Sequence, residues 1–390
     1  MNKKLSFLII VLFLLKISYG QDKTYSLNGY LTNMQSVMIP DSMDGSWTND
    51  NLIHSRLQFK WFPTNHFTFS ADLRTRIFTG ETVKYTPGYS QMLDKDGGYI
   101  DLNTNIIDEQ SILMNSMLDR LYLSYEIGKL NITAGRQRIN WGRSLVWNPN
   151  DLFNNYSYFD FDYPEKPGAD AVRLQYYTGP MSKAELVVKA DSADQLTIAG
   201  LYKFNVKNQD IQIIGGLLNE EDYAVGIGYE GYIKAVSVRG EYTYLHPKEN
   251  FNDTTSLSLL SFSLDYMFPN SLMIQTEFLY NQQPENSTVT NFMQYYSKPL
   301  TVKNLSFTEY NLFAGISYPI NPILTAGISG MFYPKIEGFF IGPNLSYSLA
   351  DNFEFSVNAQ SFSGKLPDPI SGEEVRTTLS FGFLRLKWNF

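Results

Sequence analysis

The sequence predicts an all-β fold, a transmembrane antiparallel β-barrel of about eighteen strands. Segments in which polar and apolar residues alternate recur along the chain, with turn residues between them. The first part of the chain has the pattern of a secretory signal, and residues 384–390 alternate and end on an aromatic ring. No later segment has the roughly 18 continuous apolar residues of a membrane-spanning helix, so only a closed barrel would satisfy its backbone in lipid.

The N-terminus predicts a cleavable signal peptide over residues 1–20. Two lysines precede a short apolar run over residues 5–15, and Ser18 and Gly20 place small residues just before the cleavage site. A membrane anchor would need about 20 apolar residues, more than this run provides. Cleavage removes three lysines and no acidic residue, so the formal net charge changes from −8 to −11. The remaining domain, residues 21–390, therefore lacks the basic character expected of a nucleic-acid-binding protein.

Eighteen segments have the alternation of a strand, and sixteen is the alternative count. They are expected at residues 25–38, 50–62, 66–79, 117–127, 129–138, 169–179, 181–190, 194–204, 209–218, 221–230, 232–245, 255–268, 271–282, 306–318, 321–333, 336–349, 352–363 and 374–390. An even number of strands places both termini on the same side of the membrane, which is the periplasmic side in bacterial barrels.

The lengths of the connections support a barrel. The second connection and every second one after it are tight turns. The remaining connections include all the long ones, and we expect long external loops at residues 80–116, 139–168 and 283–305. Bacterial barrels have the same pattern of short periplasmic turns and longer external loops.

The alternating faces predict a wet lumen. In the segment 66–79, Phe67 and Leu73 share one side, whereas Asp72 and Arg74 share the other. The apolar side would face lipid and the polar side would face the lumen, which sixteen to eighteen strands make wide enough for a channel.

Charged residues on the inner faces separate into two walls. The basic wall of the pore is expected to contain Arg56, Lys60, Arg74, Arg76, Arg120 and Arg173. The acidic wall is expected to contain Asp265, Glu277, Glu309 and Glu354. Because the two groups come from strands about half a barrel apart, they would create a transverse field that orients dipolar solutes. The alternative is that these charges pair locally and simply wet the lumen.

The connection over residues 139–168 and the strands that flank it contain several short motifs. In chain order these are Gly135-Arg136-Gln137, Trp141-Gly142, Asn148-Pro149 with Asp151, and Pro167-Gly168 with Asp170 and Arg173. Together they resemble a segment of Gram-negative porin-like families, including the alginate-export-like barrels. The resemblance covers about residues 130–177 and implies a porin-like outer-membrane barrel.

The same connection is expected to fold inward and narrow the pore. It contains two tryptophans and an aromatic-acidic run over residues 156–163, and an apolar patch of this size usually packs or binds something. The residues expected to shape the constriction are Trp141, Arg143, Trp147, Asp151 and Asp160. The position of the loop resembles that of the constriction loop of trimeric porins. Packing on the outer rim or on a neighbouring subunit is the alternative. The aromatic run could also stack on sugar rings, although anchoring of the loop is the simpler interpretation.

The residues of catalysis and metal binding do not form a recognisable pattern. His54, His66 and His246 lie far apart in the sequence and share no motif with a nucleophile. Residues 94–101 place aspartates at alternating positions, as a calcium loop does, but lack the oxygen ligand at the fifth position and the later glutamate. We therefore expect no enzymatic activity, no cofactor and no metal.

The sequence thus predicts an outer-membrane porin of a Gram-negative bacterium that allows passive diffusion of small hydrophilic solutes and ions. Outer-membrane lipid and lipopolysaccharide are its expected surroundings, and a homotrimer is one option for its assembly. Phe390, at the end of an alternating strand, resembles the signal by which barrels are delivered to their assembly machinery. The alternative function is that of a plugged barrel that acts as an interaction or export-associated protein.

Overall fold

The structure is a computed structural model that describes residues 24–40, 47–155, 157–163, 165–249, 251–252, 256–283, 300–368 and 371–390. The predicted signal peptide, residues 1–20, lies outside the described residues. Most of the predicted external loop over residues 283–305 also lies outside them.

The described residues form nineteen strands and four short helices. The strands are β1 (Tyr25–Pro40), β2 (Thr48–Thr64), β3 (Phe67–Gly80), β4 (Asn103–Glu109), β5 (Ile112–Ile127), β6 (Leu130–Gln137), β7 (Ala169–Gly179), β8 (Ser182–Ala190), β9 (Leu196–Val206), β10 (Gln209–Leu218), β11 (Asp222–Ile233), β12 (Val236–Pro247), β13 (Leu257–Met267), β14 (Met273–Asn281), β15 (Tyr310–Asn321), β16 (Leu324–Tyr333), β17 (Gly338–Ala350), β18 (Phe353–Pro367) and β19 (Glu374–Asn389). The helices are α2 (Glu81–Tyr85), α3 (Tyr89–Leu93), η1 (Val302–Asn304) and η2 (Pro334–Ile336). None of these helices is long and apolar enough to cross a membrane.

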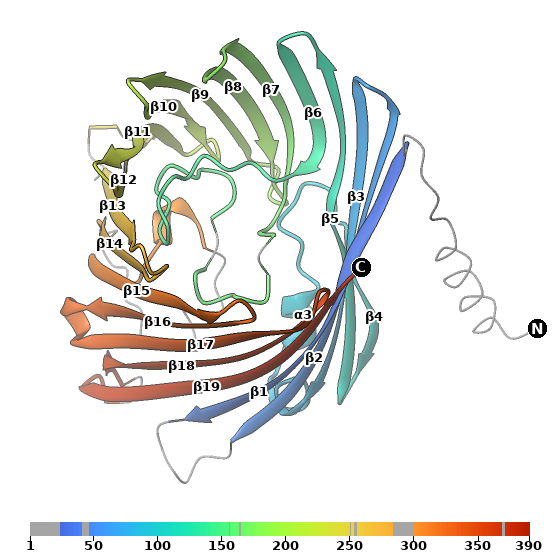
Figure 1. Cartoon of the computed structure of the whole chain (residues 1–390), viewed down its shortest axis with the longest axis vertical. Helices are drawn as coiled ribbons and strands as arrows, with labels where there is room; N and C mark the ends of the chain where they lie inside the picture. Colours follow the sequence, from blue (N-terminus) through green and yellow to red (C-terminus); the bar gives the residue numbers. More distant parts are fainter. Residues whose placement is uncertain are drawn as a thin grey trace, which may run out of the picture.

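Eighteen of the strands form a closed antiparallel barrel, which confirms the predicted fold and strand number. β1 closes the ring because it pairs with β2 along one edge and with β19 along the other. Figure 1 shows the strands arranged around an interior that holds part of the chain. Closure pairs the strand edges that an open sheet would leave unsatisfied.

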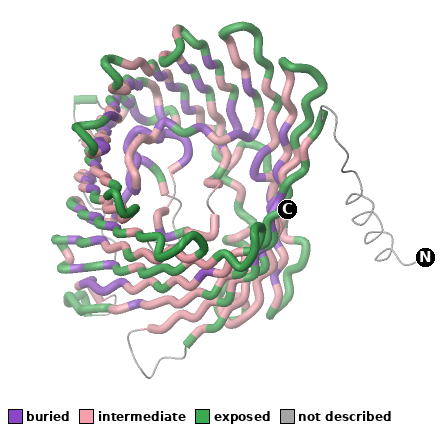
Figure 2. The backbone as a smooth tube through the Cα atoms, in the orientation of Figure 1, coloured by how far each residue is buried: buried purple, intermediate pink, exposed green. Residues whose placement is uncertain are grey.

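The two faces of the barrel follow the alternation of the sequence. On β19, Leu384 and Trp388 are exposed on the outer face, whereas Phe383 and Arg385 point inward toward residues 161–162 of the interior chain segment. Figure 2 shows the same alternation of exposed and more buried residues along many of the strands. The outer face is therefore largely apolar and the inner face is mixed.

The start of β1 and the C-terminal residue lie at the end of the barrel that carries the short turns. Tyr25, the first residue of β1, pairs with Trp61 close to the β2–β3 turn. At the other terminus, the backbone groups of Phe390 and Gly29 exchange two hydrogen bonds of 2.9 Å. The turns at this end are tight, and Lys207 and Asn208 in the β9–β10 turn both adopt positive φ angles, a conformation that Asn tolerates well. The longer connections lie at the opposite end, called here the long-loop end.

The predicted loop over residues 80–116 differs most from the structure. It contains α2, α3 and β4, and β5 already begins at Ile112. One edge of β5 pairs with β3, while the other edge pairs with β4 over residues 112–117 and with β6 over residues 121–127. β4 is thus an additional short strand that continues the wall where β6 has ended.

Candidate functional site

The connection between β6 and β7, residues 138–168, lies inside the barrel and is called loop 3 here (Figure 1). Its two ends are held together by Arg136 of β6 and Asp170 of β7, whose side chains form two hydrogen bonds of 2.7 and 2.9 Å. These residues belong to the Gly135-Arg136-Gln137 and Pro167-Gly168 motifs. A bidentate arginine–carboxylate pair is rigid, so it fixes the point where the chain enters and leaves the lumen.

Two carboxylates of the barrel wall bind the backbone of the first half of loop 3. Glu277 on β14 accepts hydrogen bonds from the N–H groups of Leu145, Val146 and Trp147, at 2.9, 2.9 and 2.7 Å. Glu241 on β12 accepts hydrogen bonds from the N–H groups of Arg143, Ser144 and Asn150. Six backbone donors of the loop are therefore satisfied by two side chains of the wall.

Apolar packing reinforces this attachment. Trp141, Trp147, Leu152 and Phe153 are all buried, and the rings of Trp141 and Phe153 pack edge to face with centroids 4.8 Å apart. The indole N–H of Trp141 also donates a hydrogen bond of 3.2 Å to Glu185 on β8. The expectation that the loop folds inward is confirmed by these contacts, which bury its apolar patch against the wall.

The second half of loop 3 continues along the inner wall from β15 to β19 and β2. The rings of Tyr158, Phe159 and Phe161 pack edge to face on wall residues, with centroid distances of 5.1, 4.8 and 4.9 Å. Those wall residues are Phe313, Phe340 and Phe383, respectively. Next to them, Asp162 lies 2.9 Å from Nδ1 of His54 on β2. The described part of the aromatic run therefore anchors the loop, as the simpler interpretation proposed.

The returning arm of loop 3, residues 163 and 165–168, contacts β3 and β5. The guanidinium of Arg74 lies over the ring of Tyr163, 3.9 Å from its centroid. Arg120 donates hydrogen bonds to the carbonyl oxygens of Glu165 and Lys166, at 2.8 and 2.6 Å. This arm separates the interior into cavities on its two sides.

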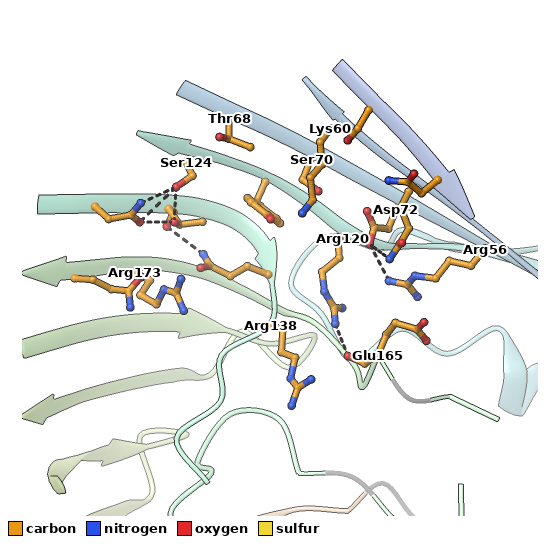
Figure 3. Close-up of a pocket in the computed structure, with 18 residues that line it drawn as sticks. Arg56, Lys60, Thr68, Ser70, Asp72, Arg120, Ser124, Arg138, Glu165 and Arg173 are labelled. Carbon is orange, nitrogen blue, oxygen red and sulfur yellow. Dashed lines mark hydrogen bonds and ion pairs between the residues drawn. The ribbon is translucent and has the colours of Figure 1, made fainter. Parts of the chain in front are cut away.

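On the short-turn side lies a polar cavity of about 580 Å³, which we call the basic chamber (Figure 3). Its cationic lining residues are Arg56, Lys60, Arg120, Arg138 and Arg173, and its carboxylates are Asp72 and Glu165. Three of these cations, Lys60, Arg138 and Arg173, have no ion-pair partner among the described residues. The chamber therefore has a positive potential that attracts anions.

A β-bulge adds an acidic residue that the alternation does not predict. Opposite Asp72 and Leu73 of β3, β5 contains one extra residue, and both Asp119 and Arg120 are buried as a result. Asp119 forms an ion pair with Arg56 and lies 3.6 Å from Nε of Arg74. The positive charges of Arg56 and Arg74, two of the predicted basic-wall residues, are thus partly neutralised. Arg76, a third, donates a hydrogen bond of 2.8 Å to Asn115.

The predicted acidic wall is not a row of free carboxylates. Asp265 pairs with Arg239, and Glu354 pairs with Arg385 at 3.2 Å, which follows the alternative of local pairing. Glu277 is 2% exposed and holds loop 3. The inward position expected for Glu309 is wrong, because β15 begins only at Tyr310 and the Glu309 carboxylate interacts with the hydroxyl of Tyr280.

The residues expected to shape the constriction have two different positions. Trp141, Trp147 and Asp151 are buried between the loop and the wall, so they position the loop and do not face a passage. Arg143 is partly exposed in the lumen and lies 3.4 Å from Glu230 of β11. Asp160 is exposed and lines a cavity on the long-loop side.

Burial shifts the pKa values of three loop 3 residues. It raises the pKa of Asp151 from 3.8 to about 6 and the pKa of Tyr163 from 10.0 to about 12. It lowers the pKa of Lys166 from 10.5 to about 8, and the neighbouring charge of Arg138 acts in the same direction. These shifts follow from the cost of placing a charge away from water.

The aspartates of residues 94–101 serve the local backbone. Asp94 accepts a hydrogen bond from the N–H of Asn105 at 2.9 Å, and Asp96 forms an ion pair of 2.7 Å with Arg136. Asp101 accepts a hydrogen bond from the N–H of Asn103 at 3.1 Å. Within the part of the chain that the structure describes, no group of three His, Cys, Asp or Glu residues could hold a metal ion.

No protein-family model matches the sequence, and no curated protein is similar to it. Several solved structures have a similar fold. OccAB4 of Acinetobacter baumannii has a TM-score of 0.57 and 10% identity, with 95% of this chain and 99% of that chain covered. OprD of Pseudomonas aeruginosa has a TM-score of 0.56 and 9% identity, with 96% and 97% covered. OpdQ of Pseudomonas aeruginosa has a TM-score of 0.56 and 8% identity, with 94% and 99% covered. At these identities the likeness shows a shared barrel fold.

Proposed function

We propose that the chain is a porin of a Gram-negative outer membrane, through which small hydrophilic solutes and ions diffuse passively. The observation that carries the proposal is loop 3, which is attached to both sides of the inner wall and leaves a polar cavity of about 580 Å³ beside it. The fold shared with OccAB4 and OprD, which are outer-membrane porins, supports the same function. Loop 3 would set the size limit for solutes.

The basic chamber suggests a preference for anions. The expected basic wall contributes Arg56, Lys60, Arg120 and Arg173 to its lining. Arg138 of loop 3 adds a further cation. Solutes with negative charge would be concentrated there, because a polar cavity with low-dielectric walls focuses the field of its charges.

The orientation in the membrane follows from the lengths of the connections. We assign the short-turn end, which carries the start of β1 and the C-terminal residue, to the periplasm, and the long-loop end to the exterior. Residues 1–20 would direct export and be removed. Outer-membrane lipid and lipopolysaccharide would cover the apolar outer face, and Phe390 would be recognised by the barrel assembly machinery. Assembly as a homotrimer is compatible with such a barrel.

Single-channel recording tests the function. The folded barrel, inserted in a planar bilayer in potassium chloride, is expected to give steady ohmic current steps. A variant that lacks residues 157–163 of loop 3 is expected to conduct more, because it removes the anchors on Phe313, Phe340 and Phe383. A parent barrel that inserts fully but stays silent would contradict the proposal.

A plugged barrel is the second candidate. It is favoured by the end of the connection 283–305, because Val302 and Leu305 are 2% and 1% exposed and pack in the same apolar cluster as loop 3. Two segments then occupy the lumen. A parent barrel that is silent, together with a loop-shortened variant that conducts, would support this candidate.

A further inference from the structure

Aromatic rings gather on the long-loop side of the returning arm of loop 3. A cavity of about 430 Å³, called the aromatic vestibule here, lies between loop 3 and β19. Its aromatic lining residues are Phe159, Phe161, Tyr163, Phe381 and Phe383. The rings of Phe381 and Phe383 are almost parallel, with an interplanar angle of 16° and centroids 6.1 Å apart, and Phe161 packs on Phe383 at 4.9 Å.

Hydrogen-bonding groups of loop 3 and the wall border these rings. Asp160 is exposed and lines the vestibule, and its carboxylate forms no ion pair with any described residue. Asp162 presents Oδ1, which is buried without a hydrogen bond and lies 3.9 Å from Arg385. Asn155, Ser157 and Gln360 complete the polar lining. The vestibule thus combines flat apolar surfaces with a few polar groups, as small-molecule sites do, and its volume falls in the range of about 300–1,000 Å³ typical of such sites.

Charges of both signs surround the vestibule. Asp162 faces His54 and Arg385, and Arg74 and Arg76 act electrostatically on Asp160. A free anion would meet two carboxylates, and a free cation would meet three guanidinium groups. The vestibule is therefore better suited to a neutral solute than to an ion.

A pyranose sugar ring is neutral, and it combines a flat apolar face with polar groups. Its C–H groups form a flat apolar face that packs on an aromatic ring, and its hydroxyl groups donate strong hydrogen bonds to carboxylates. We propose that the aromatic vestibule is a binding subsite for one ring of a neutral sugar, with Phe383 and Phe381 as the stacking surface and Asp160 as the hydroxyl acceptor. This inference rests on the proposed function, since it names a solute class for the same lumen.

Equilibrium dialysis of radiolabelled maltose against the detergent-solubilised barrel tests the subsite. Saturable binding is expected for maltose and not for sorbitol, which has hydroxyl groups but no ring face. Phe383→Leu keeps apolar volume but removes the flat ring, and it should weaken binding about five- to ten-fold. Phe381→Leu is a second variant of the same kind. Phe339→Leu, on the outer face, is the matched control and should leave binding unchanged.

Substitutions of Asp160 show whether the aromatic vestibule binds a sugar or a cation. Asp160→Ala should weaken maltose binding about five-fold, whereas Asp160→Asn should retain it within about two-fold, because the amide still exchanges hydrogen bonds with hydroxyl groups. Saturable binding of tetramethylammonium that Asp160→Asn abolishes, or equal binding of maltose and sorbitol, would overturn the proposal.

Current recordings then distinguish the subsite from the porin function. Maltose should interrupt the open-channel current, and Phe383→Leu should shorten the interruptions. A barrel that conducts but neither binds maltose nor is interrupted by it would refute the subsite and leave the porin function intact. A silent barrel that binds maltose with the expected variant pattern would support the subsite and refute the porin function.

Discussion

At the scale of single residues, Asp151 is a buried carboxyl without an ion-pair partner among the described residues. Its pKa in the folded chain, about 6, is above the usual value of 3.8. The folded state therefore binds the proton more tightly than the unfolded state, and stability falls as pH rises from about 4 to about 6 and then levels off. At neutral pH the ionised carboxylate lowers the stability of the fold, even though it accepts a hydrogen bond from the N–H of Asn154 at 3.2 Å.

Asp151→Asn is expected to remove this cost and keep the hydrogen bond. At pH 7.5 the variant should be more stable than the parent by about 1–3 kcal/mol, and the difference should disappear below about pH 4. Urea titration followed by semi-native electrophoresis measures the folded fraction at both pH values. Asp351→Asn, in an exposed turn, is the control. Equal pH dependence in Asp151→Asn and the parent would contradict the interpretation.

The unpaired cations of the basic chamber are expected to set ion selectivity. Arg138→Gln and Arg173→Gln each remove one charge that lines the chamber and has no ion-pair partner among the described residues. At about 8 Å in water-like surroundings one positive charge stabilises an anion and destabilises a cation by about 0.5 kcal/mol each, so each variant should lower the anion-to-cation permeability ratio roughly five-fold. Reversal potentials in a potassium chloride gradient measure this ratio, at low ionic strength to limit screening. Arg376 pairs instead with Glu337 near the β18–β19 connection, so Arg376→Gln is the control and should change the ratio little. If Arg173→Gln changed the permeability ratio no more than Arg376→Gln does, the cations of the basic chamber would not set ion selectivity.

At the scale of elements, loop 3 is held by carboxylates that belong to other strands. Glu241→Gln and Glu277→Gln each replace a carboxyl group that accepts hydrogen bonds from three backbone N–H groups with an amide that also carries donors. The double variant should loosen loop 3 and destabilise the barrel by about 2–4 kcal/mol. Its single-channel current should be larger and noisier than that of the parent. Glu354→Gln, which disrupts only a lumenal ion pair with Arg385, is the matched control. Quiet currents of parental size in the double variant would show that the loop is positioned by its aromatic contacts alone.

The sequence predicts the strands better than it predicts the lumen. Period-two alternation marks the face of a residue, and each of the eighteen expected segments corresponds to a strand of the barrel. Alternation does not reveal a bulge, and one extra residue in β5 turns Asp119 inward. The five-residue helices α2 and α3 have no side-chain cap hydrogen bond, so little in their sequence marks them as helical.

The site depends on contacts that are remote in sequence. Glu277 and the N–H of Trp147 are 130 residues apart, and no local pattern pairs them. Alternation places Glu277 on the inner face but gives no indication of what it binds there. The aromatic density of loop 3 did predict that the loop packs inward, because an apolar patch must be covered. Which of its residues anchor the loop and which face a cavity follows only from the folded chain.

At the scale of the whole molecule, the barrel is a ring whose closure depends on the seam between β1 and β19. Eleven residue pairs from Tyr30 with Asn389 to Pro40 with Leu379 form this seam. Next to the pair of Tyr30 and Asn389, Phe390 and Gly29 exchange two backbone hydrogen bonds of 2.9 Å. A Cβ at Gly29 would lie 2.4 Å from the carbonyl oxygen of Arg56 and 2.8 Å from the Phe390 ring. Only glycine therefore allows the C-terminal ring to lie against the first strand without a shift of the backbone.

Gly29→Ala is expected to weaken the seam, because its methyl group would displace both the Arg56 carbonyl and the Phe390 ring. The cost should be about 1–3 kcal/mol, the range for overpacking a close contact. Gly240→Ala on β12 is the matched control, since its Cβ would meet the nearest atom at 3.7 Å, an ordinary contact. In urea titration of the detergent-folded barrel, the midpoint should fall for Gly29→Ala and stay near the parental value for Gly240→Ala. Because all strands share one closed hydrogen-bonded ring, the transition of Gly29→Ala should remain a single step. A midpoint equal to that of Gly240→Ala would mean that the C-terminal residue does not contribute to closure.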